Sequence, residues 1–299
     1  MGAIFLFACV QVLQREAVPL PHKLKRRVPV QPACIRVNPP GGAPFFRLEV
    51  YCRKGRGGAP EIPWDAVERA AGRLRTRLLL PAGVCLPAPP PARSAAQAQL
   101  EPGLRAFSPK RLPLLLSLRM AQQVLRASRV PAQQLRVTVV DTKGTLCHAI
   151  DALAPLAGSL RVYTPDAAQY KATAARLLRR WGATLILSDS PGCFAQSHVV
   201  VADDLRLFSG CERGLIFSPD THTPLKARVV RCRAPQLPEA YAGLCPPGID
   251  PLLFACALYE LCGIKEMERL QFGHFAFDNV SRVFSVQELG GLIEMAGKH

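Results

Sequence analysis

The sequence lacks any apolar run of the roughly 18 residues that a membrane-spanning helix needs, so an integral membrane protein is not expected. Its 11 cysteines include no CxxC pair and its 6 histidines form no HExxH motif, so we expect no zinc knuckle and no zinc-protease helix, and we assign no metal ligands. Aromatic residues make up only 7% of the 299 residues, and they are sparse beside the basic runs. This scarcity disfavours a surface that stacks nucleic-acid bases.

What is present is ordinary for a globular protein, with 49% hydrophobic and 20% charged residues. The odd number of cysteines, several of them in apolar strings such as 254–258, is typical of packed thiols in a reducing compartment. The apolar opening at 3–10 has no basic residue before it, the reverse of a secretory signal. We therefore expect a first strand or an N-terminal extension there, and a cytoplasmic protein.

Positive charge is concentrated in the first third of the chain. The net charge is +16, and residues 1–110 hold 17 basic and 6 acidic side chains, a net charge of +11. Such an excess is compatible with binding to nucleic acid or another anionic partner, and equally with a solvated arginine-rich surface. The charge alone does not decide between these two interpretations.

The same region, 1–110, is predicted to be a small basic α+β region. Residues 35–52 alternate apolar and polar around a Pro-Pro-Gly-Gly turn, which predicts a hairpin. Apolar residues recur at helical spacing over 63–78. Stacked prolines over 80–110 indicate a semi-extended linker and a domain boundary.

After this linker the pattern changes to short β-rich runs separated by single helices. Such alternation predicts parallel strands joined by crossovers. Helices are expected at 113–128, 145–156 and 165–181, the last closed by Gly182. Strands are expected at 135–140, 160–163, 183–187 and 198–201, with further strand candidates at 205–208, 215–217 and 227–230.

The predicted fold class is therefore α/β: a Rossmann-like parallel sheet flanked by helices over 111–235, preceded by the smaller N-terminal α+β region. A C-terminal helical segment, 236–299, is expected to pack on the α/β domain, with helices at 250–262 and 286–295. Within it, 273–279 is expected to form an edge strand and a turn.

The strand–turn–helix order over 134–204 resembles the first half of a Rossmann-type dinucleotide-binding domain. The resemblance implies NAD or NADP, with the pyrophosphate on the turn after the first strand and the ribose held by an acid after the second strand. The turn departs from the usual three glycines, because it has one, and Asp141 would bring a negative charge close to a phosphate. The candidate cofactor-binding residues are Thr142, Lys143, Gly144, Thr145, Thr164 and Asp166.

Each candidate also has a purely structural interpretation. Thr164 can cap a helix that begins at Pro165, with Asp166 opposing the positive end of the helix dipole. Asp203 and Asp204 can hold a divalent cation or lie in a solvated loop. Cys147 and His148 diverge by about 100° on a helix, so no nucleophile–base pair and no catalytic residue are assigned.

Three functions stay open at this point, and so does the question of whether the protein is an enzyme. The first is a protein that binds a nucleotide or dinucleotide, an oxidoreductase among other options. The second is a non-catalytic scaffold or binding protein that kept the fold without the cofactor. The third is a nucleic-acid-binding protein that uses the basic N-terminal region. A fold of this kind hosts many functions and does not choose among them.

Overall fold

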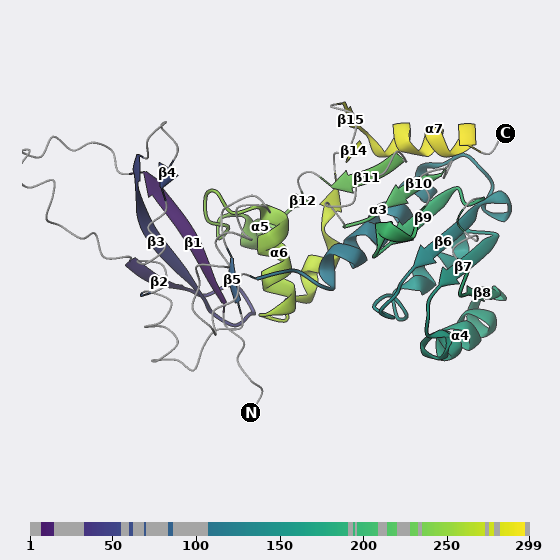
Figure 1. Ribbon diagram of the computed structural model, residues 1–299, viewed down its shortest axis with the longest axis horizontal. Helices are drawn as coiled ribbons and strands as arrows, with labels where there is room; N and C mark the ends of the chain where they lie inside the picture. The colour runs from purple at the N-terminus through teal and green to yellow at the C-terminus, as the bar shows by residue number, and fades with distance from the viewer. Residues whose placement is uncertain are drawn as a thin grey trace, which may run out of the picture. The chain divides into compact units, whose positions relative to one another are not determined.

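The computed structural model shows two compact units, Met1–Pro109 with Leu237–Arg269, and Lys110–Gln236 with Leu270–His299 (Figure 1). The sequence predicts that 236–299 packs on the α/β domain, whereas 237–269 groups with the N-terminal region. The structure describes residues 7–14, 33–54, 60–61, 69, 83–85, 107–190, 194, 196–208, 214–219, 228–232, 235–272, 275–277 and 282–296.

The first unit is built on a sheet of order β2-β3-β1-β5, with β4 paired to β3. The expected hairpin is confirmed, because β2 and β3 pair antiparallel with Val37 opposite Phe45. The segment 80–110 is not all linker, since β5 pairs parallel with β1. The helix expected at 63–78 lies almost entirely outside the described residues. The strands are β1 (Phe7–Gln14), β2 (Ala33–Val37), β3 (Phe45–Lys54), β4 (Pro60–Glu61) and β5 (Gly83–Cys85).

Helix α6 (Pro251–Glu260) explains why 237–269 belongs to this first unit. Its residues 253–259 are all buried, so the helix needs apolar cover on every side. The Phe254 ring lies 5.5 Å from the Phe45 ring and 6.4 Å from the Phe7 ring, centroid to centroid. The short helix α5 (Glu239–Ala242) and the 3-10 turn at Lys265–Arg269 flank α6 in the chain.

The second unit contains an eight-stranded sheet of order β15-β14-β11-β10-β9-β6-β7-β8. The run from β8 to β11 is parallel throughout. Numbered along the chain, these six strands have the order 3-2-1-4-5-6 of doubly wound dinucleotide-binding domains. The fold class is thus the expected Rossmann-like α/β sheet. The strands are β6 (Arg136–Val140), β7 (Ser159–Tyr163), β8 (Leu185–Ser188), β9 (Val199–Ala202), β10 (Leu215–Phe217) and β11 (Arg228–Cys232).

Two antiparallel strands, β14 (Phe275–Phe277) and β15 (Val283–Phe284), extend this sheet beyond β11. The prediction of an edge strand at 273–279 was wrong, because β14 is paired on both sides. A separate two-stranded pair joins β12 (Pro235–Gln236) to β13 (Gln271–Phe272).

Helices pack on the sheet as expected, except in the connection between β6 and β7, where the predicted helix is absent. Helix α3 (Leu112–Ala127) packs on β9, β10 and α7 (Val286–Ala296). The approach of α3 to α7 is close, because a Cβ on Gly290 would lie 2.8 Å from the Ala127 carbonyl oxygen. No helix among the described residues has the length and apolar character to cross a membrane.

The segment 145–156, expected as a helix, forms turns and two short 3-10 segments, Ile150–Ala152 and Ala154–Leu156. Pro155 interrupts this segment, because proline has no N–H to continue an α-helix. The strand candidate 205–208 was also wrong. It is a 3-10 turn, Leu205–Leu207, in which the Asp204 side chain accepts the Arg206 amide at 2.9 Å.

The predicted helix at 165–181 begins with a 3-10 turn, Ala167–Tyr170, and continues as α4 (Lys171–Trp181). Its end is confirmed, since Gly182 has the left-handed φ of +61° that a C-terminal cap requires. Its start differs from the prediction, in which Thr164 caps the helix. The Asp166 carboxylate accepts the Ala168 amide at 3.1 Å, so Asp166 is itself the cap.

Candidate functional site

The site expected from the sequence lies at the carboxyl ends of β6, β7 and β9. The order of the sheet reverses between β6 and β9, and ligands of doubly wound sheets bind at such a switch point. Asp141 follows β6 and Asp203 follows β9. The Asp203 amide donates to the Val140 carbonyl at 3.1 Å, which holds the two turns side by side.

Asp141 is fully buried and accepts three hydrogen bonds. One oxygen accepts the Thr145 amide at 2.9 Å, and the other accepts the Leu146 amide and the Tyr170 hydroxyl, each at 2.6 Å. Burial raises the pKa of Tyr170 far above its ordinary value, and the neighbouring Asp141 carboxylate raises it further. The phenol is therefore a permanent donor to Asp141.

Asp203 holds the other half of the turn. Its Oδ2 accepts both the Thr142 amide at 2.9 Å and the Thr142 hydroxyl at 2.6 Å. Its Oδ1 is buried and has no hydrogen-bond partner among the described residues. Burial raises the pKa of Asp203, while the two bonds from Thr142 act in the opposite direction.

Asp204 has a different role from Asp203. Its carboxylate pairs with Arg206 at 2.6 Å, and this contact lowers the pKa of Asp204. The two carboxylates are thus engaged with separate partners. Within the described ranges no group of three or more His, Cys, Asp or Glu side chains could hold a metal ion.

The single glycine of the turn is covered by a side chain. Gly144 has a φ of +68°, and a Cβ built on it would lie 1.6 Å from Gln169 Oε1. The Gln169 amide in turn donates to Asp166 Oδ2 at 2.9 Å. Thr164 is buried, and its hydroxyl accepts the Asp166 amide at 3.3 Å. Gln169 therefore links the first turn to the acid at the end of β7.

The structure brings all six candidate residues to the carboxyl ends of β6 and β7, with Lys143 exposed at the tip of the turn. Sequence reasoning missed Tyr170, which donates to Asp141, and Gln169, which donates to Asp166. The signal for Gln169 was its place three residues after Asp166, one helical turn away. Tyr170 was assigned only to the apolar stripe of a helix, and its hydroxyl gives no sequence signal.

These residues do not fit a dinucleotide pyrophosphate in the usual position. A Rossmann turn binds phosphate through free backbone amides at the start of a helix. Here the amides of Thr142, Thr145 and Leu146 already donate to Asp203 and Asp141. A phosphate would have to displace buried carboxylates and then lie beside their negative charge.

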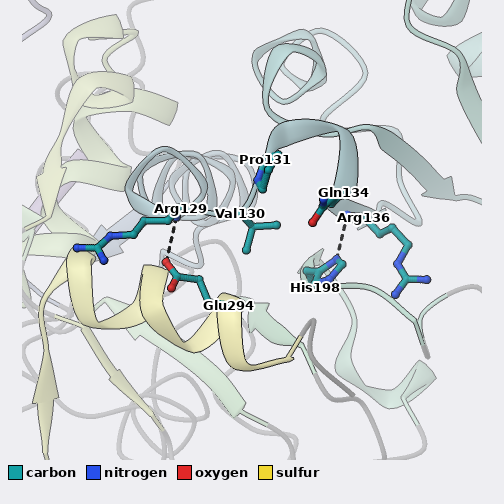
Figure 2. A pocket seen from close by; sticks show the side chains of 7 residues that line it. All are labelled: Arg129, Val130, Pro131, Gln134, Arg136, His198 and Glu294. Atoms are coloured by element: carbon teal, nitrogen blue, oxygen red, sulfur yellow. Dashed lines mark hydrogen bonds between the residues drawn. The ribbon is translucent and has the colours of Figure 1, made fainter.

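A cavity of about 360 Å³ lies at the other end of the strands, where β6 and β9 begin (Figure 2). His198 is buried, with 7% of its surface exposed, and its Nδ1 accepts the Arg136 amide at 3.1 Å. Glu294 accepts the Arg129 amide at 3.1 Å. The cavity is lined by Arg129, Val130, Pro131, Gln134, Arg136, His198 and Glu294.

His198 predicts a pH dependence of stability. Burial lowers its pKa, and the Arg136 charge lowers it further, so the folded protein takes up a proton on this ring less readily than the unfolded chain does. The unfolded chain takes up the proton first, below the ordinary pKa of about 6.5, so stability is lost as the pH falls below that value. His198→Asn keeps an acceptor for the Arg136 amide. The melting temperature should fall less in the variant than in the wild type between pH 7 and 5, and equal slopes would contradict this assignment.

Comparison with known proteins identifies no family. No protein-family model matches the chain, and no curated protein matches it. Among solved structures, the chain is similar to L-tryptophan dehydrogenase from Nostoc punctiforme at 13% identity and a TM-score of 0.31, over 98% of this chain and 80% of that one. A likeness this weak carries no functional argument, so the fold class rests on the strand order of the sheet.

Proposed function

We propose that this chain is a binding protein that keeps a Rossmann-like sheet without using its switch point to hold a dinucleotide. The observation that supports the proposal is the buried Asp141 carboxylate, which accepts the Thr145 and Leu146 amides and the Tyr170 hydroxyl. This carboxylate takes the position in the hydrogen-bond pattern that a ligand phosphate takes in a nucleotide-binding turn.

Two further features support the proposal. The Thr142 amide is bonded to Asp203, so a third donor of the turn is engaged. The Gln169 side chain lies against Gly144, the position where backbone should approach a pyrophosphate most closely. A dinucleotide would therefore have to break several buried hydrogen bonds before it could form its own.

The test is a thermal melt of the full chain with NAD, NADH, NADP and NADPH up to millimolar concentration. We expect no rise in the melting temperature. A ligand that binds only the folded state stabilises it by about 2.7 kcal/mol at a concentration of 100 times its Kd. A dose-dependent rise with any of the four would overturn the proposal.

One observation favours nucleotide binding as a second candidate. Lys143 and Asp166 are both exposed, at the ends of the adjacent strands β6 and β7, where a phosphate and a ribose would lie. This candidate predicts that ADP raises the melting temperature of the wild type and that Asp166→Asn abolishes the rise. Absence of a rise in the wild type would remove it.

Nucleic-acid binding by residues 1–110 stays a prediction, as does a cytoplasmic location. The proposed contact is electrostatic, so affinity for a single-stranded oligonucleotide should fall steeply between 50 and 200 mM salt, by about 300-fold when six phosphates are neutralised. Binding that does not change with salt would rule it out.

A further inference from the structure

Exposed apolar side chains gather at one edge of the large sheet. Among the described residues four large apolar side chains are exposed, and three of them lie on α4 and β8. They are Leu178, 58% exposed, Trp181, 46% exposed, and Ile186, 43% exposed, whereas Val283 lies on β15 at the opposite edge. Helix α4 packs on β8, and Figure 1 shows the two side by side.

The polar contacts of α4 show which side of the helix faces the rest of the domain, and its most exposed apolar residue lies on the other side. Thr173 donates to the Cys147 carbonyl at 2.7 Å, and Arg176 pairs with Asp151 at 2.6 Å. Leu178 follows Arg176 by two residues and is therefore about 200° from it around the helix. Leu178 thus lies on the flank of α4 that faces away from these contacts.

Strand β8 is the last strand of the sheet, and β7 is its only partner within the described part of the chain. It contains no charged residue and no proline, and these are the residues that protect an edge strand from further pairing. Its open side offers backbone donors and acceptors. Because side chains alternate, Ile186 points to the face opposite to Leu185 and Leu187.

A strand added beside β8 would therefore have apolar neighbours on both faces. Alternate side chains would lie next to Ile186 on one face and next to Leu187 and the outer flank of α4 on the other. Residues on both sides of the added strand would then lose solvent exposure.

The same edge carries uncompensated positive charge on both faces. Helix α4 contains four basic residues and no acidic one, and of the four only Arg176 has a carboxylate partner within the described ranges. On the other face Arg161 lies directly beside Ile186 in the register, and its Nε is buried without a hydrogen-bond acceptor among the described residues. The acidic residue nearest to β8 in the sequence is Asp189, which directly follows the strand.

We infer that the β8 edge is a docking site for an extended, acidic segment of another protein, with apolar side chains at alternate positions, which pairs with β8 as an added strand. The charge selects an acidic partner over a second copy of this chain, which carries the same positive edge. The open backbone of β8 selects a peptide over a lipid surface, because lipid chains have no groups to pair with it. This inference is independent of what happens at the switch point.

The test begins with random heptapeptides displayed on phage and selected on the immobilised full-length protein. Enriched peptides should be acidic with alternating apolar residues. Their affinity, measured by fluorescence anisotropy on synthetic copies, should fall about tenfold or more for Ile186→Glu, because the variant removes an apolar contact and repels acidic side chains. Val283→Glu is the matched control, since Val283 is also 43% exposed and on a terminal strand. The Val283→Glu variant should bind the selected peptides with the affinity of the wild type.

A second variant keeps the test decisive if Ile186→Glu fails to fold. Leu178→Glu changes a side chain that is 58% exposed, so folding should be unaffected while affinity falls. Selection of no peptides, or of peptides without acidic residues, would overturn the inference, as would equal binding by the variants. Two other results would also overturn it: a wild-type dimer in sedimentation that Ile186→Glu dissociates, or binding to phosphatidylserine vesicles that Leu178→Glu abolishes.

Discussion

Replacing Asp141 with alanine should lower the free energy of unfolding of the second unit by about 3–5 kcal/mol, because three hydrogen-bond donors lose their acceptor. The substitution leaves the Thr145 and Leu146 amides and the Tyr170 hydroxyl without an acceptor. Each buried donor that loses its partner costs about 1–3 kcal/mol. Urea unfolding followed by circular dichroism measures the loss.

The same variant should respond to a small carboxylate in a way that the wild type does not. Formate is small enough to replace the missing carboxyl group, so it should recover part of the lost stability of Asp141→Ala. Chloride at equal ionic strength is the salt control, and Asp141→Asn is the matched variant, since it keeps the shape and one acceptor. If Asp141→Ala loses less than about 1 kcal/mol, the carboxylate does not hold the turn.

Replacing Phe254 with alanine should be comparably costly, at about 3–5 kcal/mol, but in the other unit. The ring is fully buried and packs against the Phe7 and Phe45 rings, so truncation leaves a cavity in the core of the first unit. Hydrogen exchange followed by mass spectrometry locates the effect. Peptides that cover 33–54 and 251–260 should lose protection.

Peptides from the large sheet supply the internal control for this variant. Those covering 136–140 and 159–163 should keep their protection, because β6 and β7 belong to the second unit and Phe254 to the first. Leu178→Ala is the surface control, expected to change stability by no more than about 0.5 kcal/mol. Loss of protection in β6 and β7 with retention in β3 would show that α6 belongs to the α/β domain after all.

Much of the large sheet could be predicted, because its strands are short apolar runs bounded by turns. Strands β6, β7 and β9 lie within two residues of their expected positions, and Gly182 ends its helix where the sequence indicates. The order 3-2-1-4-5-6 could be anticipated only for the first half, where helical spacers separate the strands. Beyond β9 the sequence pattern predicts no helical spacer between the strands, so it does not show which edge each strand joins.

The failures also have physical causes. Helix α6 is apolar on all sides, so its sequence does not say which unit will cover it. The segment 145–156 has helical composition, but Pro155 has no N–H to continue an α-helix, and the segment forms turns and two short 3-10 segments. The charge of Asp141 could be seen in the sequence as unfavourable for a phosphate. Its main side-chain partner, Tyr170, lies 29 residues further along and is brought to it only by the fold.

The most direct measurement is a nuclear magnetic resonance titration of the backbone amides of Thr145 and Leu146 with ADP and NAD. If Asp141 holds these amides, their resonances stay unchanged up to millimolar ligand, and their hydrogen exchange is slow with or without it. Saturable shifts of both amides, with faster exchange before the ligand is added, would contradict the account, because they would mean that the turn is open to a phosphate.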